Sequence, residues 1–193
     1  MSRTERSRRQ IFDSAVIEFE AAGVEATSME KIARRAGLTR ATLYNLFSGK
    51  EEIAEIIVGE KIGVWDAEIR QRLTEGSDPL ELIVEALQRN AETCLAYPRI
   101  AVSVLTSPQR HAPSESRGRY PSFRHLIVDL MKAAQAERRL RTDLPPETLM
   151  FIVMGLYVQF MIHQIVKGGP MPPEAIPKLV RTTCEGIGPQ ERA

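Results

Sequence analysis

A short segment between residues 39 and 50 carries side chains suited to contacts with a nucleic acid. Hydroxyl and ammonium groups can donate hydrogen bonds to backbone phosphates, which fixes position without reading sequence. The phosphate contacts predicted here are Thr39, Thr42, Tyr44 and Lys50. Arg and Asn can each bond twice to a base edge, and a small apolar side chain can touch a thymine methyl. The predicted base-reading residues are Arg40, Ala41 and Asn45.

Two short helices would hold these side chains on one face. Thr27-Ser28-Met29-Glu30 has the spacing of a capping box, in which a hydroxyl and a carboxylate satisfy unpaired backbone N–H groups, and it predicts a helix start at Thr27. That helix should stop at Gly37, which permits a positive φ. A second helix is expected over 40–47. In a helix-turn-helix, the first helix crosses the DNA backbone and the second enters the major groove.

The apolar residues of this segment fall on the opposite side from the polar ones. The side chains expected to pack inward are Met29, Ile32, Ala33, Leu43 and Phe47. Ala33 is small enough to allow the two helices to approach closely. The segment therefore predicts one buried face and one face open to DNA.

Charge along the chain is uneven, although the formal net charge is only +1. Residues 1–50 hold nine Lys and Arg against six Asp and Glu, whereas residues 51–75 hold three against seven. Such placement indicates a basic surface near the N-terminus. Four of the basic residues are Arg3, Arg6, Arg8 and Arg9. This arginine cluster could reach a minor groove or a phosphate, and it could equally remain solvated.

The rest of the chain scans at helical period, so the predicted fold class is all-α with about nine helices. A first helix of about five turns should end at Gly23, and Ser48-Gly49-Lys50-Glu51 reads as a second capping box. The later helices are expected at 50–74, 78–97, 99–107, 122–139, 146–166 and 173–187, with a loop at 108–121. No repeat of fixed period occurs.

Residues 149–166 are apolar on all sides and reach the lower limit of a membrane span. Pro145 and Pro146 open this stretch, Gly168 and Gly169 close it, and no aromatic belt anchors its ends. A helix of this kind can instead lie between its own core and a partner subunit. We interpret it in that second way, with Gly155 allowing close helix contact, and keep a membrane-associated or partner-binding helical protein as the alternative.

The run from Thr27 to Ile53 closely resembles the signature of the TetR/AcrR family of transcriptional regulators. The matching positions are Ile32-Ala33, Ala36-Gly37, Leu43-Tyr44, Phe47 and Lys50-Glu51. Leu46 and the pair Arg40-Ala41 depart from the commonest pattern, so no operator sequence can be transferred from a relative. The resemblance adds Thr27 to the expected phosphate contacts.

This resemblance implies a helix-turn-helix DNA-binding domain over 1–50 and a ligand-sensing and dimerisation domain over 51–193. The expected protein is a cytoplasmic repressor that binds a palindromic double-stranded DNA operator as a homodimer. Its dimer contact would use the C-terminal helices, about 145–187, and an unidentified small-molecule effector would release it. Residues expected around the ligand pocket are Trp65, Ile69, Cys94, Val102, Leu105, Leu126, Met154, Tyr157, Met161 and His163.

An enzyme is not predicted. The three His residues are scattered, and the sequence has no Gly-rich phosphate loop, zinc-ligand spacing or nucleophile elbow. No catalytic residue, cofactor or metal site is therefore expected. Cys94 and Cys184 lie singly in apolar helical patterns and are interpreted as buried free thiols.

Overall fold

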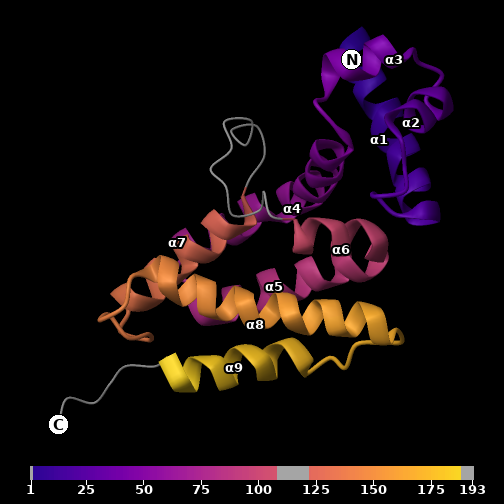
Figure 1. Ribbon diagram of the computed structural model, residues 1–193. Coiled ribbons are helices and arrows are strands. Elements are labelled where there is room, and N and C mark those ends of the chain that lie inside the picture. The colour runs from indigo at the N-terminus through magenta and orange to yellow at the C-terminus, as the bar shows by residue number, and fades with distance from the viewer. Residues whose placement is uncertain (1, 108–121, 188–193) are drawn as a thin grey trace. The chain divides into compact units, whose positions relative to one another are not determined.

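A computed structural model describes residues 2–107 and 122–187, and within these ranges the chain forms nine helices and no strand (Figure 1). The helices are α1 (Arg3–Ala22), α2 (Met29–Arg35), α3 (Arg40–Leu46), α4 (Lys50–Thr74), α5 (Pro79–Ala96), α6 (Pro98–Thr106), α7 (Phe123–Ala136), α8 (Pro146–Lys167) and α9 (Ala175–Ile187). The all-α prediction is confirmed. The loop expected at 108–121 lies outside the described residues.

The chain divides into two compact units. Unit 1 comprises Met1–Lys61 and Thr93–Glu115, and unit 2 comprises Ile62–Glu92 and Ser116–Ala193. Helices α4 and α5 each contribute residues to both units. The functional boundary expected after residue 50 stays a prediction.

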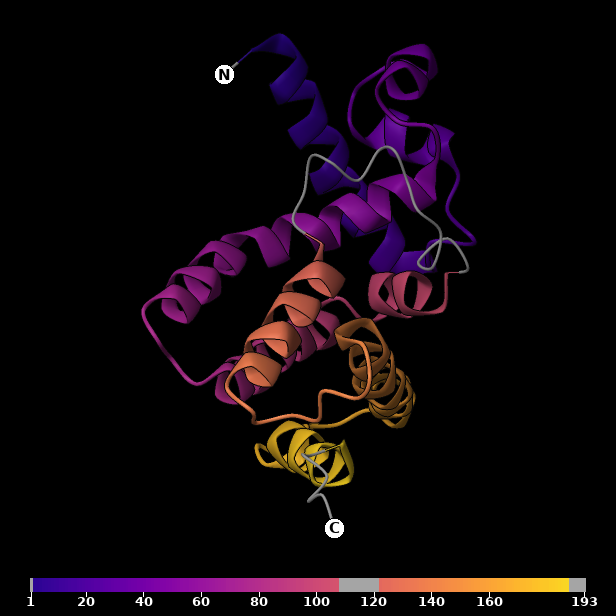
Figure 2. The same cartoon turned by 90° about the vertical axis from the view of Figure 1, so that its left-hand side faces the viewer.

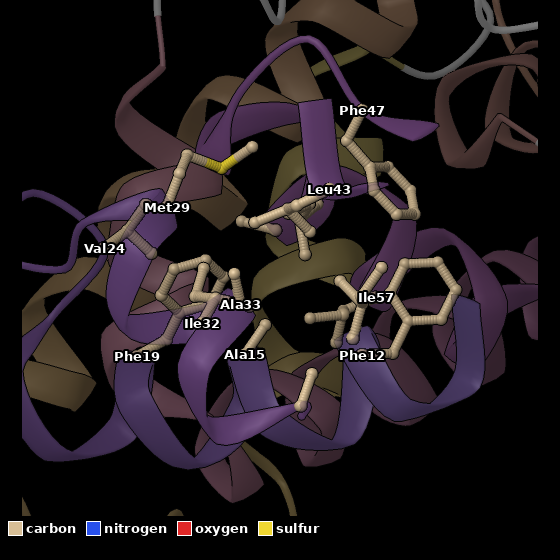
Figure 3. Close-up of a cluster of buried hydrophobic side chains, with 14 of the residues drawn as sticks. Phe12, Ala15, Phe19, Val24, Met29, Ile32, Ala33, Leu43, Phe47 and Ile57 are labelled. Atoms are coloured by element: carbon tan, nitrogen blue, oxygen red, sulfur yellow. The ribbon is translucent and has the colours of Figure 1, made fainter. Parts of the chain in front are cut away.

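Unit 1 is built on one apolar cluster, shown in Figure 3. The side chains expected to point inward from the helix-turn-helix do so, and Leu43 and Ile32 are fully buried. They meet α1 residues such as Phe12, whose ring lies 5.4 Å from that of Phe47. Burial of each large apolar side chain stabilises the fold by about 1.5–3 kcal/mol. This cluster fixes the position of α3 against α1 and α2.

The start of α2 differs from the prediction. Ser28, not Thr27, is its N-cap, and the Ser28 hydroxyl accepts a hydrogen bond from the Lys31 backbone N–H at 3.3 Å. Thr27 is 2% exposed. Its hydroxyl lies 2.8 Å from the Gly23 carbonyl oxygen and 3.2 Å from that of Glu18, to which it can donate. Burial thus removes Thr27 from capping and uses it to hold the end of α1.

The start of α4 also differs in detail, although its bounds match the prediction. The Ile53 N–H donates to the Gly49 carbonyl at 3.3 Å, so Gly49 occupies the cap position. The third helical residue is then Glu52, and its carboxylate accepts from the Ser48 backbone N–H at 2.6 Å. The carboxylate that reaches back therefore belongs to Glu52 rather than Glu51, because the helix register is one residue later than expected.

In unit 2, α8 packs between α7 and α9, and the three helices lie side by side in both views (Figures 1 and 2). The buried face of α8 includes Val153, Tyr157 and Met161. The Tyr157 hydroxyl lies 2.7 Å from Asn90 Oδ1, which gives this buried polar group a partner.

Cys94 is buried as expected, but Cys184 is only half-buried, and burial raises the pKa of its thiol.

Helix α8 is also the one helix of the described residues that is long and apolar enough to cross a membrane, judged by length and composition. Its most apolar window has a mean hydropathy of 1.8, and 39% of that window is buried. A core helix of a globular protein meets the same criterion. On its opposite face, Phe151, Ile152 and Leu156 are exposed.

Candidate nucleic-acid interface

The turn between α2 and α3 sets the direction of the candidate recognition helix. Gly37 has a φ of +66°, as its position in the turn predicted. The Leu38 N–H donates to the Ala33 carbonyl at 3.0 Å and closes the end of α2. Thr39 then caps α3, because its hydroxyl accepts from the Thr42 N–H at 3.2 Å. Thr39 and Thr42 also share a 2.9 Å hydroxyl contact, so both predicted phosphate contacts take part in this cap.

The outward face of α3 carries the three residues predicted to read bases. Arg40, Ala41 and Asn45 are all exposed, and Tyr44 lies between them on the helix surface at 44% exposure. Positions separated by four residues lie above one another on a helix, so Arg40 aligns with Tyr44, and Ala41 aligns with Asn45. The structure thus brings base-reading and phosphate-binding candidates onto one face.

An open groove of about 480 Å³ borders this face within unit 1. Its lining comes from the α1–α2 loop, the start of α2, α3, the α3–α4 loop and the start of α4, and comprises Glu25, Ala26, Thr27, Ser28, Met29, Glu30, Tyr44, Ser48, Gly49, Lys50 and Glu51. Three predicted phosphate contacts, Thr27, Tyr44 and Lys50, therefore border one depression. The lining holds three carboxylates, those of Glu25, Glu30 and Glu51, so Lys50 and the first-turn N–H groups of α4 are the parts of the groove that can attract a phosphate.

Lys50 is held by unit 1 itself. Its ammonium donates to the Glu25 carbonyl at 2.5 Å, which ties the start of α4 to the loop after α1. An ammonium group has three protons, so two remain for other acceptors. Lys50 can therefore brace the loop and contact a phosphate together. Thr27 has less freedom, because its hydroxyl already faces two carbonyl oxygens.

Arg40 has two partners, and only the contact with Tyr44 follows a helical i, i+4 spacing. Its Nη1 atom lies 2.8 Å from Glu30 Oε1, and its guanidinium lies 5.3 Å from the centre of the Tyr44 ring. The pKa of Glu30 is lowered, chiefly by a hydrogen bond to its own backbone and also by Arg40 and Ser28, against the opposing effect of burial. Glu30 therefore stays ionised beside the candidate base reader.

The N-terminal arginines divide into different roles. Arg8 is half-buried, with its guanidinium 4.7 Å from the centre of the Phe47 ring and 5.9 Å from that of Phe12. Arg9 instead pairs with Asp13 at 3.2 Å, with both side chains exposed. Arg8 thus packs against the end of α3. The contact of Arg8 with Phe12 could have been predicted from their i, i+4 spacing. The contact of Arg8 with Phe47 could not, because only the fold brings these two residues together.

Glutamates of α1 join it to α2 and α6, and sequence reasoning missed them. Glu18 Oε1 accepts from Arg35 Nε at 2.5 Å, and this hydrogen bond is the largest cause lowering the Glu18 pKa. Glu20 accepts from the backbone N–H of Ile100 at 3.0 Å and from that of Arg99 at 3.4 Å. These partners lie 17 to 80 residues away, so no local pattern could reveal them.

The candidate pocket residues fall into both compact units. Cys94, Val102 and Leu105 belong to unit 1, where Cys94 is buried and the other two are half-buried. In unit 2 the buried candidates are Trp65, Ile69, Leu126, Met154, Tyr157 and Met161. His163 is the exception, because its side chain lies on the exposed face of α8 rather than in the interior. A pocket formed by these residues stays a prediction.

Helices α1 to α3, their shared core and the polar outer face of α3 define a helix-turn-helix protein. Residues 11–57 match the family model described as "Bacterial regulatory proteins, tetR family". This segment therefore carries the helix-turn-helix pattern of TetR-family transcriptional regulators.

Curated relatives include the transcriptional regulator SrpR of Pseudomonas putida, 37% identical over 57 residues that cover 30% of this chain and 27% of that protein. The transcriptional repressor KstR2 of Rhodococcus jostii is 25% identical over 145 residues, covering 72% and 71%. The chain thus spans about a quarter of the first relative and less than three quarters of the second.

Solved structures of similar fold include FadR of Thermus thermophilus, described as a TetR-family transcriptional repressor in complex with lauroyl-CoA. It has a TM-score of 0.74 and 22% identity, covering 96% of this chain and 97% of that one. NalD of Pseudomonas aeruginosa, the secondary repressor of a multidrug efflux pump, has a TM-score of 0.68 and 21% identity, covering 96% and 98%. At these identities the likeness concerns the fold.

Proposed function

We propose that this chain is a repressor that binds a palindromic operator as a homodimer and is released by a small-molecule effector. The observation that carries the DNA-binding part is the outer face of α3, where Arg40, Tyr44 and Asn45 are exposed on a helix fixed by a buried core. In the proposed complex Arg40 and Asn45 bond to base edges. Thr39, Thr42, Tyr44 and Lys50 bond to phosphates.

The proposed dimer uses the exposed face of α8. Phe151 and Leu156 are about half exposed, and Gly155 lies beside them with open space where a Cβ would project. Gln159 and His163 continue the same stripe at intervals of four residues. The apolar part of this face, formed by Phe151, Ile152 and Leu156, is the kind of exposed surface that marks an interaction site. A second copy of α8 would cover it, and the exposed His163 would then belong to the subunit contact.

A dimer places two α3 helices on successive major grooves, about 34–36 Å apart along the DNA. The effector would bind better to a dimer in which the two DNA-binding domains have a different spacing. The affinity for DNA then falls by the factor with which the effector prefers that state, and a coupling free energy of about 1–3 kcal/mol suffices for a switch. The repressor name of KstR2 and the acyl-CoA complex of Thermus thermophilus FadR support this kind of function. The ligand class need not be shared.

The proposal can be tested by selecting duplexes from a random pool with the purified protein. We expect a selected site with two-fold symmetry, bound by an even number of chains, and an affinity that falls steeply with salt. Two variants form a matched pair. Lys50→Ala removes a half-exposed lysine from the groove, and Lys132→Ala removes an exposed lysine from α7. Only Lys50→Ala should weaken binding. Equal affinities of the two variants would contradict the assigned face.

A further inference from the structure

A buried carboxylate on α4 has one side-chain oxygen that no described residue satisfies. The Asp66 side chain is 7% exposed, and its Oδ1 atom is buried with no hydrogen-bond partner in the described part of the chain. Its other oxygen, Oδ2, accepts from Arg70 Nε at 2.8 Å. Buried polar atoms in folded proteins nearly always have partners, so a lone carboxylate oxygen indicates a site that another molecule completes.

Arg70 positions Asp66 and shares its charge with a second carboxylate. Arg70 Nη1 donates to Asp129 Oδ2 at 2.7 Å, and Asp129 is 41% exposed. Burial acts to lower the pKa of Arg70, but the hydrogen bonds to Asp129 and Asp66 outweigh it and raise the pKa. One guanidinium therefore serves two carboxylates. The cluster has more negative than positive charge, and its unpaired atom lies at the buried end.

Apart from Arg70, the buried side chains one turn from Asp66 along α4 are apolar. Ile62 and Ile69 lie about one turn before and after it on the same helix face, and both are buried. Trp65 is also buried, and its ring meets the Phe123 ring edge-on at 5.9 Å. An apolar wall with one placed polar group is the usual composition of a small-molecule site. In such surroundings a lone charged oxygen strongly favours a donor.

We propose that Asp66 Oδ1 anchors the effector of this repressor, and that the effector is an apolar molecule bearing a protonated amine. This inference rests on the proposed function and names the ligand class of its sensor. An ammonium group donates to Oδ1 and also offsets the excess negative charge of the cluster. A hydroxyl group supplies the hydrogen bond alone. A carboxylate brings a like charge to Asp66 and is disfavoured.

Three probes of equal chain length separate these chemistries: decylamine, decanol and decanoate, each titrated below its aggregation limit into the full-length protein in a calorimeter at pH 7. We expect decylamine to bind at least roughly tenfold more tightly than decanoate, with decanol between them. Bound decylamine should also lower affinity for the selected duplex. Decanoate binding as tightly as decylamine would overturn the proposal.

Two variants of the same cluster separate anchoring from general packing. Asp66→Asn keeps the side-chain shape and removes the charge, and should bring decylamine and decanol to within about twofold of each other. Asp129→Asn is the matched control, since it also removes a carboxylate from Arg70 but leaves Asp66 Oδ1 in place, and it should reduce the preference for decylamine less than Asp66→Asn does. A folded Asp66→Asn protein with an unchanged preference would contradict the anchor. If Asp66→Asn does not fold, the ranking of probes by the unaltered protein decides.

The outcomes distinguish this inference from the proposed function. If the protein binds its selected duplex tightly but ranks decanoate with decylamine, the effector class is wrong and the DNA-binding proposal stands. If no duplex is bound under any salt condition, the proposed function fails, while the probe ranking still judges the Asp66 site. Both measurements use the same full-length protein.

Discussion

Arg40 and Glu30 form an ion pair, with Arg40 Nη1 2.8 Å from Glu30 Oε1, between the starts of α3 and α2. Both side chains are largely exposed, and Tyr44 lies under the guanidinium at 5.3 Å. The residue proposed to read a base is thus held by two neighbours on the same surface. In the proposed complex Arg40 exchanges the Glu30 carboxylate for a base edge. Glu30 then opposes DNA binding because its ion pair with Arg40 must break and because its negative charge repels the phosphates.

Glu30→Gln should therefore tighten DNA binding. The change removes a negative charge beside the proposed phosphate path and frees Arg40 before DNA arrives. Glu137→Gln makes the same charge change at the exposed end of α7 and serves as the control. Fluorescence anisotropy at low salt should give a higher affinity for Glu30→Gln than for Glu137→Gln. An affinity no higher than the control would show that the ion pair does not compete with DNA.

Thr27 and Tyr44 should respond differently to removal of their hydroxyl groups. Thr27→Val takes a donor from the part-buried carbonyls of Gly23 and Glu18, and we expect a loss of about 1 kcal/mol in the free energy of unfolding. Thr27→Ser keeps that donor and should be close to the unaltered protein. Tyr44→Phe, at an exposed site, should leave stability unchanged and weaken binding to every duplex. Urea unfolding and anisotropy measure the two effects.

A stable Thr27→Val protein that bound DNA poorly would contradict this division. It would make Thr27 a phosphate contact, as the family resemblance implied, rather than a brace for the end of α1.

Glu20 should stabilise unit 1 as a long-range cap of α6. Its carboxylate accepts from the N–H groups of Arg99 and Ile100, and α6 has no cap of its own from Tyr97. Glu20→Ala leaves those donors unpaired and should cost about 1 kcal/mol of unfolding free energy, in line with other lost helix caps. Glu20→Gln keeps one acceptor and should cost less. Equal stabilities of the two variants would argue against the cap.

The ion pair of Glu18 with Arg35 should make part of the stability depend on pH. The pKa of Glu18 is lowered in the folded protein, chiefly by its hydrogen bond with Arg35. A lowered carboxyl pKa contributes stability above the unfolded-state pKa, and that contribution is lost as pH falls through the folded-state pKa. Glu18→Gln should therefore flatten the acid limb of melting temperature against pH. An acid limb that is the same in Glu18→Gln and in the unaltered protein would show that the Glu18–Arg35 pair adds no pH-dependent stability.

Leu156→Arg should separate the proposed dimer into single chains. Leu156 is 50% exposed on the apolar face of α8, and a buried unpaired charge there would oppose subunit contact. Val64→Arg is the matched control, since Val64 is 81% exposed on α4. Light scattering should give half the mass of the unaltered protein for Leu156→Arg only. Operator binding by Leu156→Arg should also be weaker, because the two DNA-binding domains are no longer linked. A dimer that persists in Leu156→Arg would place the contact elsewhere.

Much of the fold could be predicted because its signals are local. The bounds of α4 followed from a cap motif and helical periodicity, and the turn at Gly37 from the need for a positive φ. The inward positions of Leu43 and Phe47 followed from spacing alone. The start of α2 was placed one residue early, because Thr27 and Ser28 are both good caps and only tertiary burial decides between them.

The finer parts of the site depend on side chains brought together by packing. The pairing of Arg40 with Glu30 joins two helices across a turn, and no pattern within either helix contains it. The lone oxygen of Asp66 is defined by what surrounds it after folding. His163 was placed in a pocket because its sequence neighbours are apolar, yet it lies on the exposed side of α8. An all-apolar helix gives no periodic signal of which side faces the core.

The most direct test of the account measures binding to a panel of duplexes that change one operator base pair at a time. Arg40→Ala should lose about 1–3 kcal/mol of discrimination at one or two base pairs and keep it elsewhere. Tyr44→Phe should weaken binding to all members of the panel by a similar factor. That contrast would establish α3 as the reader of DNA sequence. If Arg40→Ala and Tyr44→Phe lower every affinity uniformly, or leave the panel unchanged, the outer face of α3 does not read bases.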